Sequence, residues 1–306
     1  MSYIDRTAEK IQLRDWSKIR QEWKSYVPNH KSPIPLPEDE IYELTSMASE
    51  LKRMSGVDCR DDLIEYEIEG LRTAVFQEGI GLLHKACNVL RAGADAGTAG
   101  YRTWSRSNAY HAAFFGMRSV LALLGVIVSR SKDRGADYQT DIWHERRTKR
   151  PPSLTGCPFA IRVIQRDRVE HKELWGVFSR VLRVTKIDDS VWPKSKQNPL
   201  RTMAPGDFGK FRHKVHYRSV GWCFLDVDDV SERDDLSALA KDAVEFRGLG
   251  NADDPDFPFA LGVHVTSLAA ALVFDLGKDI PLLAQEAARN QSWMQHTPWG
   301  VANAFA

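Results

Sequence analysis

The sequence predicts a mainly α-helical protein with a small two-strand β element in an insertion. Apolar residues recur at helical spacing over most of the chain, two short stretches near its middle have the patterns of strands, and segments rich in Gly and Pro separate them. Hydrophobic residues make up 43% and charged residues 27% of the 306 positions. A chain of this size and composition can bury a core, which excludes disorder as its main state.

The first third of the chain is predicted to be helical. Apolar residues at helical spacing mark a helix within residues 4–26, and four prolines between residues 28 and 37 form a stiff connector. A second helix is expected from about Glu38 to Leu51. Asp61 or Asp62 is expected to cap a longer helix that reaches about Arg91.

The middle of the chain changes pattern twice. Gly93–Gly100 predicts a flexible turn, and a helix is expected from Trp104 to about Val128. Asp137–Glu145 and Phe159–Arg166 alternate or run apolar over short lengths and predict two strands. The helical pattern returns at Val169–Val184.

The last third combines a loop with further helices. Trp192–Gly209 is rich in Pro, Lys and Gly and predicts a loop, followed by helices at Phe208–Phe224 and Leu236–Phe246. Phe257–Phe274 is an apolar stretch that only just reaches the length of a membrane span. Because acidic residues bracket it and basic anchors are missing, we expect a buried core helix and no membrane span.

These elements suggest four parts. Residues 1–55 hold the N-terminal helices and the Pro-rich connector, and residues 56–130 form the first part of a helical bundle. Residues 131–205 are an insertion with two strands and a helix, and residues 206–306 form the second part of the bundle.

Charge is balanced overall and uneven locally. Lys and Arg number 42 against 41 Asp and Glu, which excludes a polycation that binds nucleic acid by bulk charge. Lys194–Arg218 holds seven basic residues and one Asp, whereas Asp226–Asp256 holds eleven acidic and three basic residues. The two segments either neutralise one another as a solvated ion-pair surface, or the basic one faces a phosphate-bearing partner.

The composition points to a reducing compartment and to no cofactor. The four cysteines form no CxxC pair, and no signal peptide is visible, so a cytoplasmic protein is expected. The chain contains no GxxxxGK[ST] loop, no HExxH helix and no GxSxG elbow. Asp226, Asp228 and Asp229 are more typical of a solvated loop than of a cation site, and no metal is expected.

The segment Phe211–Arg218 carries the residues best suited to chemistry. If it is helical, Arg212 and His216 share one face, and so do His213 and Tyr217. Arg binds phosphate oxygens through its forked donors, and His moves protons near neutral pH. The alternative is a basic amphipathic helix packed at a domain edge. A zinc site that adds Cys223 lacks a fourth ligand.

A second informative stretch runs from Arg106 to Phe115. Ala112 and Ala113 lie among aromatic residues, which lets a neighbouring helix approach closely. A helix so apolar is expected at the centre of a bundle, and His111 within it is expected to be a core histidine unless it serves a site.

Two segments resemble HEPN domains. The sequence SNAYHAAFFGMRSVLALLG (Ser107–Gly125) is similar to the helix of that family rich in Ala and aromatic residues. KFRHKVHY (Lys210–Tyr217) is similar to its later Arg-bearing helix, in the same order. The resemblance implies a dimerising helical bundle that, in active members, cuts RNA without metal. The family places four to six residues between its Arg and His. Arg212 and His216 leave only three, whereas Arg106 and His111 leave four but lie on the wrong helix for the motif.

The resulting hypothesis is a HEPN-like ribonuclease of a bacterial toxin or anti-phage system. Its expected partners are RNA, a second copy of the chain and a protein regulator or antitoxin. The alternatives are a non-catalytic helical protein that binds a partner protein, and a role of the strands in gripping or cutting RNA. The expected catalytic residues are Arg212, His216 and His213, then Arg106 and His111, and the expected RNA-binding residues are Lys210, Lys214, Arg218 and Tyr217.

Overall fold

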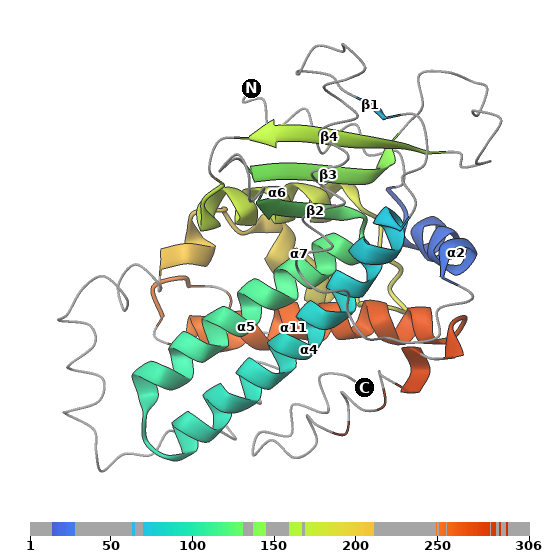
Figure 1. Cartoon of the computed structure of the whole chain (residues 1–306). Coiled ribbons are helices and arrows are strands. Elements are labelled where there is room, and N and C mark those ends of the chain that lie inside the picture. The colour runs from blue at the N-terminus through green and yellow to red at the C-terminus, as the bar shows by residue number, and fades with distance from the viewer. Residues whose placement is uncertain are drawn as a thin grey trace. The chain divides into compact units, whose positions relative to one another are not determined.

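The computed structural model shows a mostly helical chain with a small antiparallel sheet (Figure 1). The chain divides into two compact units, residues 1–80 with 121–188 and residues 81–120 with 189–306. The structure describes residues 14–27, 63–64, 70–130, 137–144, 159–166, 169–210, 249, 251–254, 256–281, 283–285, 288 and 292.

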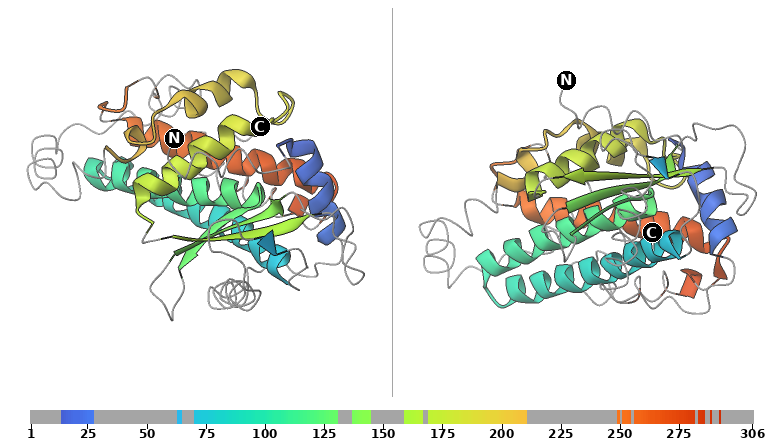
Figure 2. Two further views of the ribbon diagram at one scale, coloured as in Figure 1. Left: turned by 90° about the horizontal axis from the view of Figure 1, so that it is seen from above. Right: turned by 45° about the horizontal axis from the view of Figure 1, so that its top comes forward.

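The first unit contains the sheet. Its strand order is β1-β4-β3-β2, and all neighbouring strands are antiparallel. Helix α6 lies along one face of the sheet in both Figure 1 and Figure 2, with Trp175 and Phe178 among its buried residues. The elements are α2 (Trp16–Tyr26), β1 (Leu63–Ile64), β2 (Val126–Arg130), β3 (Asp137–His144), β4 (Ala160–Arg166) and α6 (His171–Val184).

The two predicted strands and the helix after them are confirmed as β3, β4 and α6. The sheet is larger than predicted, because β2 and the two-residue β1 also pair into it. The helix predicted to reach Val128 ends at Leu123, where Gly125 turns the chain with a φ of +87°. A Cβ on Gly125 would lie 2.1 Å from the ring of Trp143, so only glycine fits this turn into β2.

An aromatic cluster forms the core of the first unit. The rings of Trp23 and Trp143 lie 5.0 Å apart at 76°, and Phe76 lies 5.1 Å from Trp23. The indole N–H of Trp23 donates to the carbonyl of Leu123 at 2.7 Å, which satisfies its buried polar atom. The buried Arg72 donates to the carbonyl of Ile142 at 3.0 Å. The cluster thus joins α2, the start of α4 and the sheet.

Helix α4 (Leu71–Thr98) differs from the prediction at both ends. The predicted start near Asp61 is wrong, because Leu63–Ile64 pair with β4 and Gly70 has a φ of +81° immediately before the helix. The predicted turn at Gly93–Gly100 is also wrong over most of its length, since α4 continues to Thr98. Gly93 lies against α5 there: a Cβ would come 3.0 Å from the carbonyl of Ser105.

The second unit is helical in its described residues. It contains residues 81–98 of α4, residues 102–120 of α5 (Arg102–Leu123) and all of α11 (Phe257–Gly277). Helices α4 and α5 run side by side and are joined at Gly100, whose φ is +88° (Figure 1). Cys87 is buried in α4, and burial raises the pKa of its thiol to about 12.

Helix α11 is the core helix of the second unit, as predicted. It is the one helix among the described residues that is long and apolar enough to cross a membrane, and 89% of its apolar stretch is buried. It crosses α5 closely at small residues. A Cβ on Gly262 would lie 2.6 Å from the carbonyl of Ala109, and one on Gly116 would lie 3.2 Å from Cα of Thr266.

The segment predicted as a loop at Trp192–Gly209 is partly helical. It contains α7 (Lys194–Thr202) and the short 3-10 helix η1 (Asp207–Gly209). Pro193 precedes α7, and its carbonyl accepts the backbone N–H groups of Lys196 and Gln197, so the Pro that suggested a loop begins a helix. The helices predicted at Glu38–Leu51, Leu236–Phe246 and beyond Lys210 lie outside the described residues.

Candidate functional site

The residues ranked first for chemistry lie outside the described part of the chain. These are Arg212, His213 and His216, with Lys214, Tyr217 and Arg218 beside them. The structure does describe Lys210, which begins this segment, and the second pair, Arg106 and His111. The site is therefore built from these three residues and their contacts, all within the second unit.

Lys210 directly follows η1, and its backbone N–H donates to the carbonyl of Asp207. Its ammonium lies 2.9 Å from the carboxylate of Asp207 and 3.7 Å from that of Asp253. The hydrogen bond to Asp207 and the charges of both carboxylates raise the pKa of Lys210. Lys210 therefore stays protonated, and it joins the start of the predicted catalytic segment to the loop before α11.

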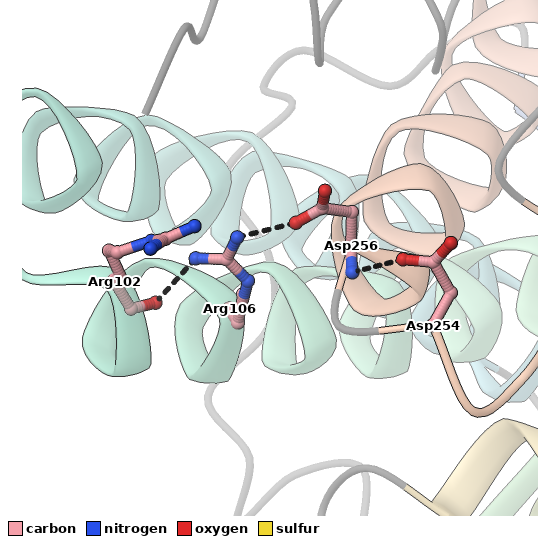
Figure 3. Close-up of polar contacts among 4 residues, drawn as sticks. All are labelled: Arg102, Arg106, Asp254 and Asp256. Atoms are coloured by element: carbon pink, nitrogen blue, oxygen red, sulfur yellow. Dashed lines mark hydrogen bonds and ion pairs between the residues drawn. The ribbon is translucent and has the colours of Figure 1, made fainter. Parts of the chain in front are cut away.

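Arg106 lies in the second turn of α5, and its side chain is 3% exposed. The guanidinium donates through Nη2 to Oδ1 of Asp256 and through Nη1 to the carbonyl of Arg102 at 3.3 Å. Asp256 immediately precedes α11. Figure 3 shows Arg102 and Arg106 side by side on α5, with Asp256 facing them from the start of α11.

Hydrogen bonds within the loop before α11 orient its carboxylates in two directions. Oδ1 of Asn251 accepts the N–H of Asp253 at 3.0 Å. Oδ1 of Asp254 accepts the N–H of Asp256 at 2.8 Å, as Figure 3 shows. These are local Asx-type turns. They leave the carboxylate of Asp253 to face Lys210 and that of Asp256 to face Arg106. One short loop thus contacts both Lys210 and Arg106, the residue directly before Ser107–Gly125.

His111 lies apart from this arrangement. It is half-buried on α5, and its ring is 5.9 Å from that of its neighbour Tyr110. It is five positions after Arg106, which puts the two side chains about 140° apart around the helix. Arg106 is buried against the loop before α11, whereas His111 belongs to the side of α5 that is open to solvent. The structure does not bring these two groups to one point.

No metal site is found in the part of the chain that the structure describes. No group of three or more His, Cys, Asp or Glu side chains there could hold an ion. Asp226, Asp228 and Asp229 lie outside that part.

Sequence reasoning found Lys210 and Arg106 but missed their partners. The opposite charges of Lys194–Arg218 and Asp226–Asp256 were the available signal, and the contact of Lys210 with Asp253 is a point where these two segments meet. Nothing in the sequence pairs Arg106 with Asp256, since 150 positions separate them.

Comparison with known proteins adds no relative: no family model, curated protein or solved structure matches this chain.

Proposed function

We propose that the protein cleaves RNA without a metal, as a HEPN-like ribonuclease acting in a bacterial toxin or anti-phage setting. The resemblance of Ser107–Gly125 and Lys210–Tyr217 to HEPN helices is the starting point. One structural observation supports it: the loop before α11 contacts Lys210 through Asp253 and Arg106 through Asp256. Arg106 and Lys210 are about a hundred positions apart in the sequence, and a shared site would require their segments to be close. Both residues contact this one loop.

The proposed chemistry uses the 2′-hydroxyl of the RNA as nucleophile. His216 takes the proton of this hydroxyl, the 2′-oxygen attacks phosphorus, and the bond from phosphorus to the 5′-oxygen breaks. Arg212 stabilises the charge on the phosphorane, and His216 returns the proton to the leaving 5′-oxygen. His213 orients the site. The products are a 2′,3′-cyclic phosphate and a 5′-hydroxyl, so the step is balanced without a co-reactant.

Substrate affinity in this proposal comes from the cations around the site. Lys210, Lys214 and Arg218 attract the RNA backbone, and Tyr217 offers a ring for a base. Lys210 is already held in its protonated form by Asp207. A homodimer would place two copies of the segment face to face, and a protein regulator or antitoxin would cover it.

Substitution of the two leading residues tests the proposal. Arg212→Ala and His216→Ala are each expected to reduce RNA cleavage in EDTA by at least a hundredfold, because one removes charge stabilisation and the other the proton carrier. Lys194→Ala is the matched control: it is a cation of the same basic segment, 77% exposed and paired only at the surface with Asp189. Cleavage that survives both substitutions would refute the proposal.

A non-catalytic helical partner protein is the second candidate, and one observation favours it. The described cations of the site are neutralised by the chain's own carboxylates, Arg106 by Asp256 and Lys210 by Asp207. If the protein is such a partner protein, a pull-down is expected to recover a stoichiometric protein partner, and RNA incubated with the purified protein is expected to stay intact.

A further inference from the structure

The sheet of the first unit buries polar side chains in its middle. Strand β3 is buried along its whole length, although it contains Asp137, Gln139 and Asp141. These three residues alternate along the strand and therefore share one face of the sheet. Their exposed fractions are 7%, 2% and 1%. Residues of these types are mostly exposed in proteins, so their burial together requires an explanation.

Arg162 of β4 joins these residues on the same face. It is the cross-strand partner of Asp141 and is 4% exposed. Opposite charges that face one another across two strands ordinarily attract and pair. Within the described residues, no ion pair joins Arg162 to Asp141, and Nη1 of Arg162 has no hydrogen-bond partner. The guanidinium is thus buried with a donor atom that the described residues do not use.

A hydrogen bond within β3 holds the carboxylate of Asp141. Nε2 of Gln139 donates to Oδ1 of Asp141 at 3.1 Å. Asp137 is held separately, because its carboxylate accepts the backbone N–H of Val169. Burial of a guanidinium without an acceptor is costly, which points to a group from outside the chain as the acceptor of Arg162.

Apolar side chains flank the polar residues. Strands β2, β3 and β4 lie side by side (Figure 1), and Val126 of β2 is opposite Asp141. Val126, Asp141 and Arg162 therefore form one row across the three strands, and Ile164 is opposite Gln139 in the next row. Val126 and Ile164 are 1% and 3% exposed. A few polar groups among apolar side chains are typical of sites that enclose a small ligand.

The charges of this face favour a neutral ligand that has both acceptors and donors. An anion such as phosphate would meet the carboxylates of Asp137 and Asp141, and a cation would meet Arg162. A zwitterion would bring two further charges into a buried site. Guanine is neutral, and its O6 and N7 are a pair of acceptors that suit the fork of an Arg side chain. Its N1–H and 2-amino group are donors that suit a carboxylate.

We propose that the face of the sheet defined by Gln139, Asp141 and Arg162 binds a guanine base. Arg162 donates to O6 and N7, and the carboxylate of Asp141 accepts from N1–H and the 2-amino group. Gln139 keeps that carboxylate in place. Because these residues are almost completely buried, the site encloses the base, as pockets for bases taken out of a stack do. The binding needs no cleavage, since none of these residues belongs to the Arg212 site.

Isothermal titration calorimetry of the unmodified full chain with mononucleotides tests the proposal. GMP is expected to bind, whereas AMP, which has an amino donor in place of O6, and inorganic phosphate are not. Inosine monophosphate lacks the 2-amino group and 7-deaza-GMP lacks N7, so each is expected to bind at least about tenfold more weakly than GMP. Equal affinities for GMP and AMP, or for GMP and phosphate, would overturn the proposal.

Two substitutions test the assigned residues. Arg162→Lys keeps the charge but loses the fork, and Asp141→Asn removes the acceptor pair for N1–H and the 2-amino group. Each is expected to weaken GMP binding at least about tenfold. Arg183→Lys is the matched control, because Arg183 is an exposed arginine on α6 of the same unit. Thermal unfolding establishes that each variant is folded, and GMP binding that survives both substitutions would refute the assignment.

A labelled RNA distinguishes a guanine within a strand from a free nucleotide. The probe is a fluorescein-labelled oligo(A) of ten nucleotides with one central guanine, and oligo(A) alone is its control. Anisotropy is followed on the full chain carrying both Arg212→Ala and His216→Ala, so that cleavage does not consume the probe. Preference for the guanine-containing RNA assigns the site to a base in RNA, and binding of GMP alone assigns it to a free nucleotide. Absence of both would overturn the proposal.

The outcomes separate this site from the proposed ribonuclease. Guanine binding by a protein that leaves RNA intact would support the site and refute the ribonuclease. Cleavage by the unmodified chain, with no binding of GMP and no preference for the guanine-containing RNA, would refute the site alone.

Discussion

At the scale of single residues, the contact of Arg106 with Asp256 is the ion pair of the described site whose cation is buried. The guanidinium is buried, whereas the carboxylate is 38% exposed, so the two partners are desolvated to different degrees. Loss of the carboxylate would remove this negative charge from beside a buried cation, which costs more than the loss of an exposed pair.

We therefore expect Asp256→Asn to lower the free energy of unfolding by about 1–3 kcal/mol, discounted for the exposure of Asp256. Urea denaturation followed by circular dichroism measures it. Asp253→Asn is the matched control from the same loop, and it weakens the solvent-exposed contact with Lys210. Equal stability of the two variants would mean that the buried position of Arg106 does not matter.

Asp15 makes a second prediction at this scale, because it caps α2. Its carboxylate accepts hydrogen bonds from the hydroxyl of Ser17 at 2.8 Å and from the Ser17 N–H at 3.0 Å. The side-chain hydrogen bond from Ser17 is the largest cause that lowers the pKa of Asp15 below 3.8. A lowered carboxyl pKa stabilises the fold above the unfolded pKa, and this stabilisation is lost as pH falls through the folded value.

Asp15→Ala is accordingly expected to lower the free energy of unfolding by about 1 kcal/mol at pH 7. The difference from the unmodified protein should shrink below about pH 4, where the carboxyl of Asp15 begins to bind a proton in the unfolded chain, and continue to fall as pH passes through the lower folded pKa. Denaturation at pH 7 and at pH 3 measures both values. A difference that is the same at the two pH values would show that the charge of Asp15 contributes nothing.

At the scale of elements, the crossing of α5 and α11 depends on glycine. Gly262 lets the two helices approach until a Cβ would be 2.6 Å from the carbonyl of Ala109, a contact that backbone atoms cannot relieve cheaply. We expect Gly262→Ala to destabilise the protein by about 1–3 kcal/mol through overpacking. Gly206→Ala is the control, since no atom lies within 4 Å of its Cβ position and its φ is −70°. Thermal unfolding compares the two, and equal midpoints would contradict the close crossing.

Local periodicity predicted the elements whose signal is contained in their own residues. The apolar stretch of α11, the alternation in β3 and the amphipathic pattern of α6 are such cases. It could not predict β1, whose two residues become a strand only because β4 supplies their partners. Periodicity also predicted that the helix of α5 continues into β2, because the apolar run continues past Gly125. The close contact of Gly125 with the ring of Trp143, which only glycine allows, comes from the fold and not from the local pattern.

In the candidate site, too, the sequence predicted some contacts and could not predict others. Opposite charge runs in the sequence anticipated a contact such as that of Lys210 with Asp253. The bond of Arg106 with Asp256 depends on the packing of α5 against α11, which no local pattern encodes. The roles of Arg212, His213 and His216, the four-part domain division and the cytoplasmic location stay predictions.

At the scale of the whole molecule, the described part of the candidate cleavage site lies within the second unit. Lys210 contacts Asp207 and Asp253 there, and Arg106 contacts Asp256 at the start of α11.

The most direct test of the central claim is the chemical form of the RNA ends after incubation with the purified protein in EDTA. The account predicts fragments that end in a 2′,3′-cyclic phosphate and begin with a 5′-hydroxyl, because the 2′-oxygen attacks and His216 protonates the leaving oxygen. Intact RNA in EDTA, or fragments with 5′-phosphates that form only after a divalent metal is added, would contradict it.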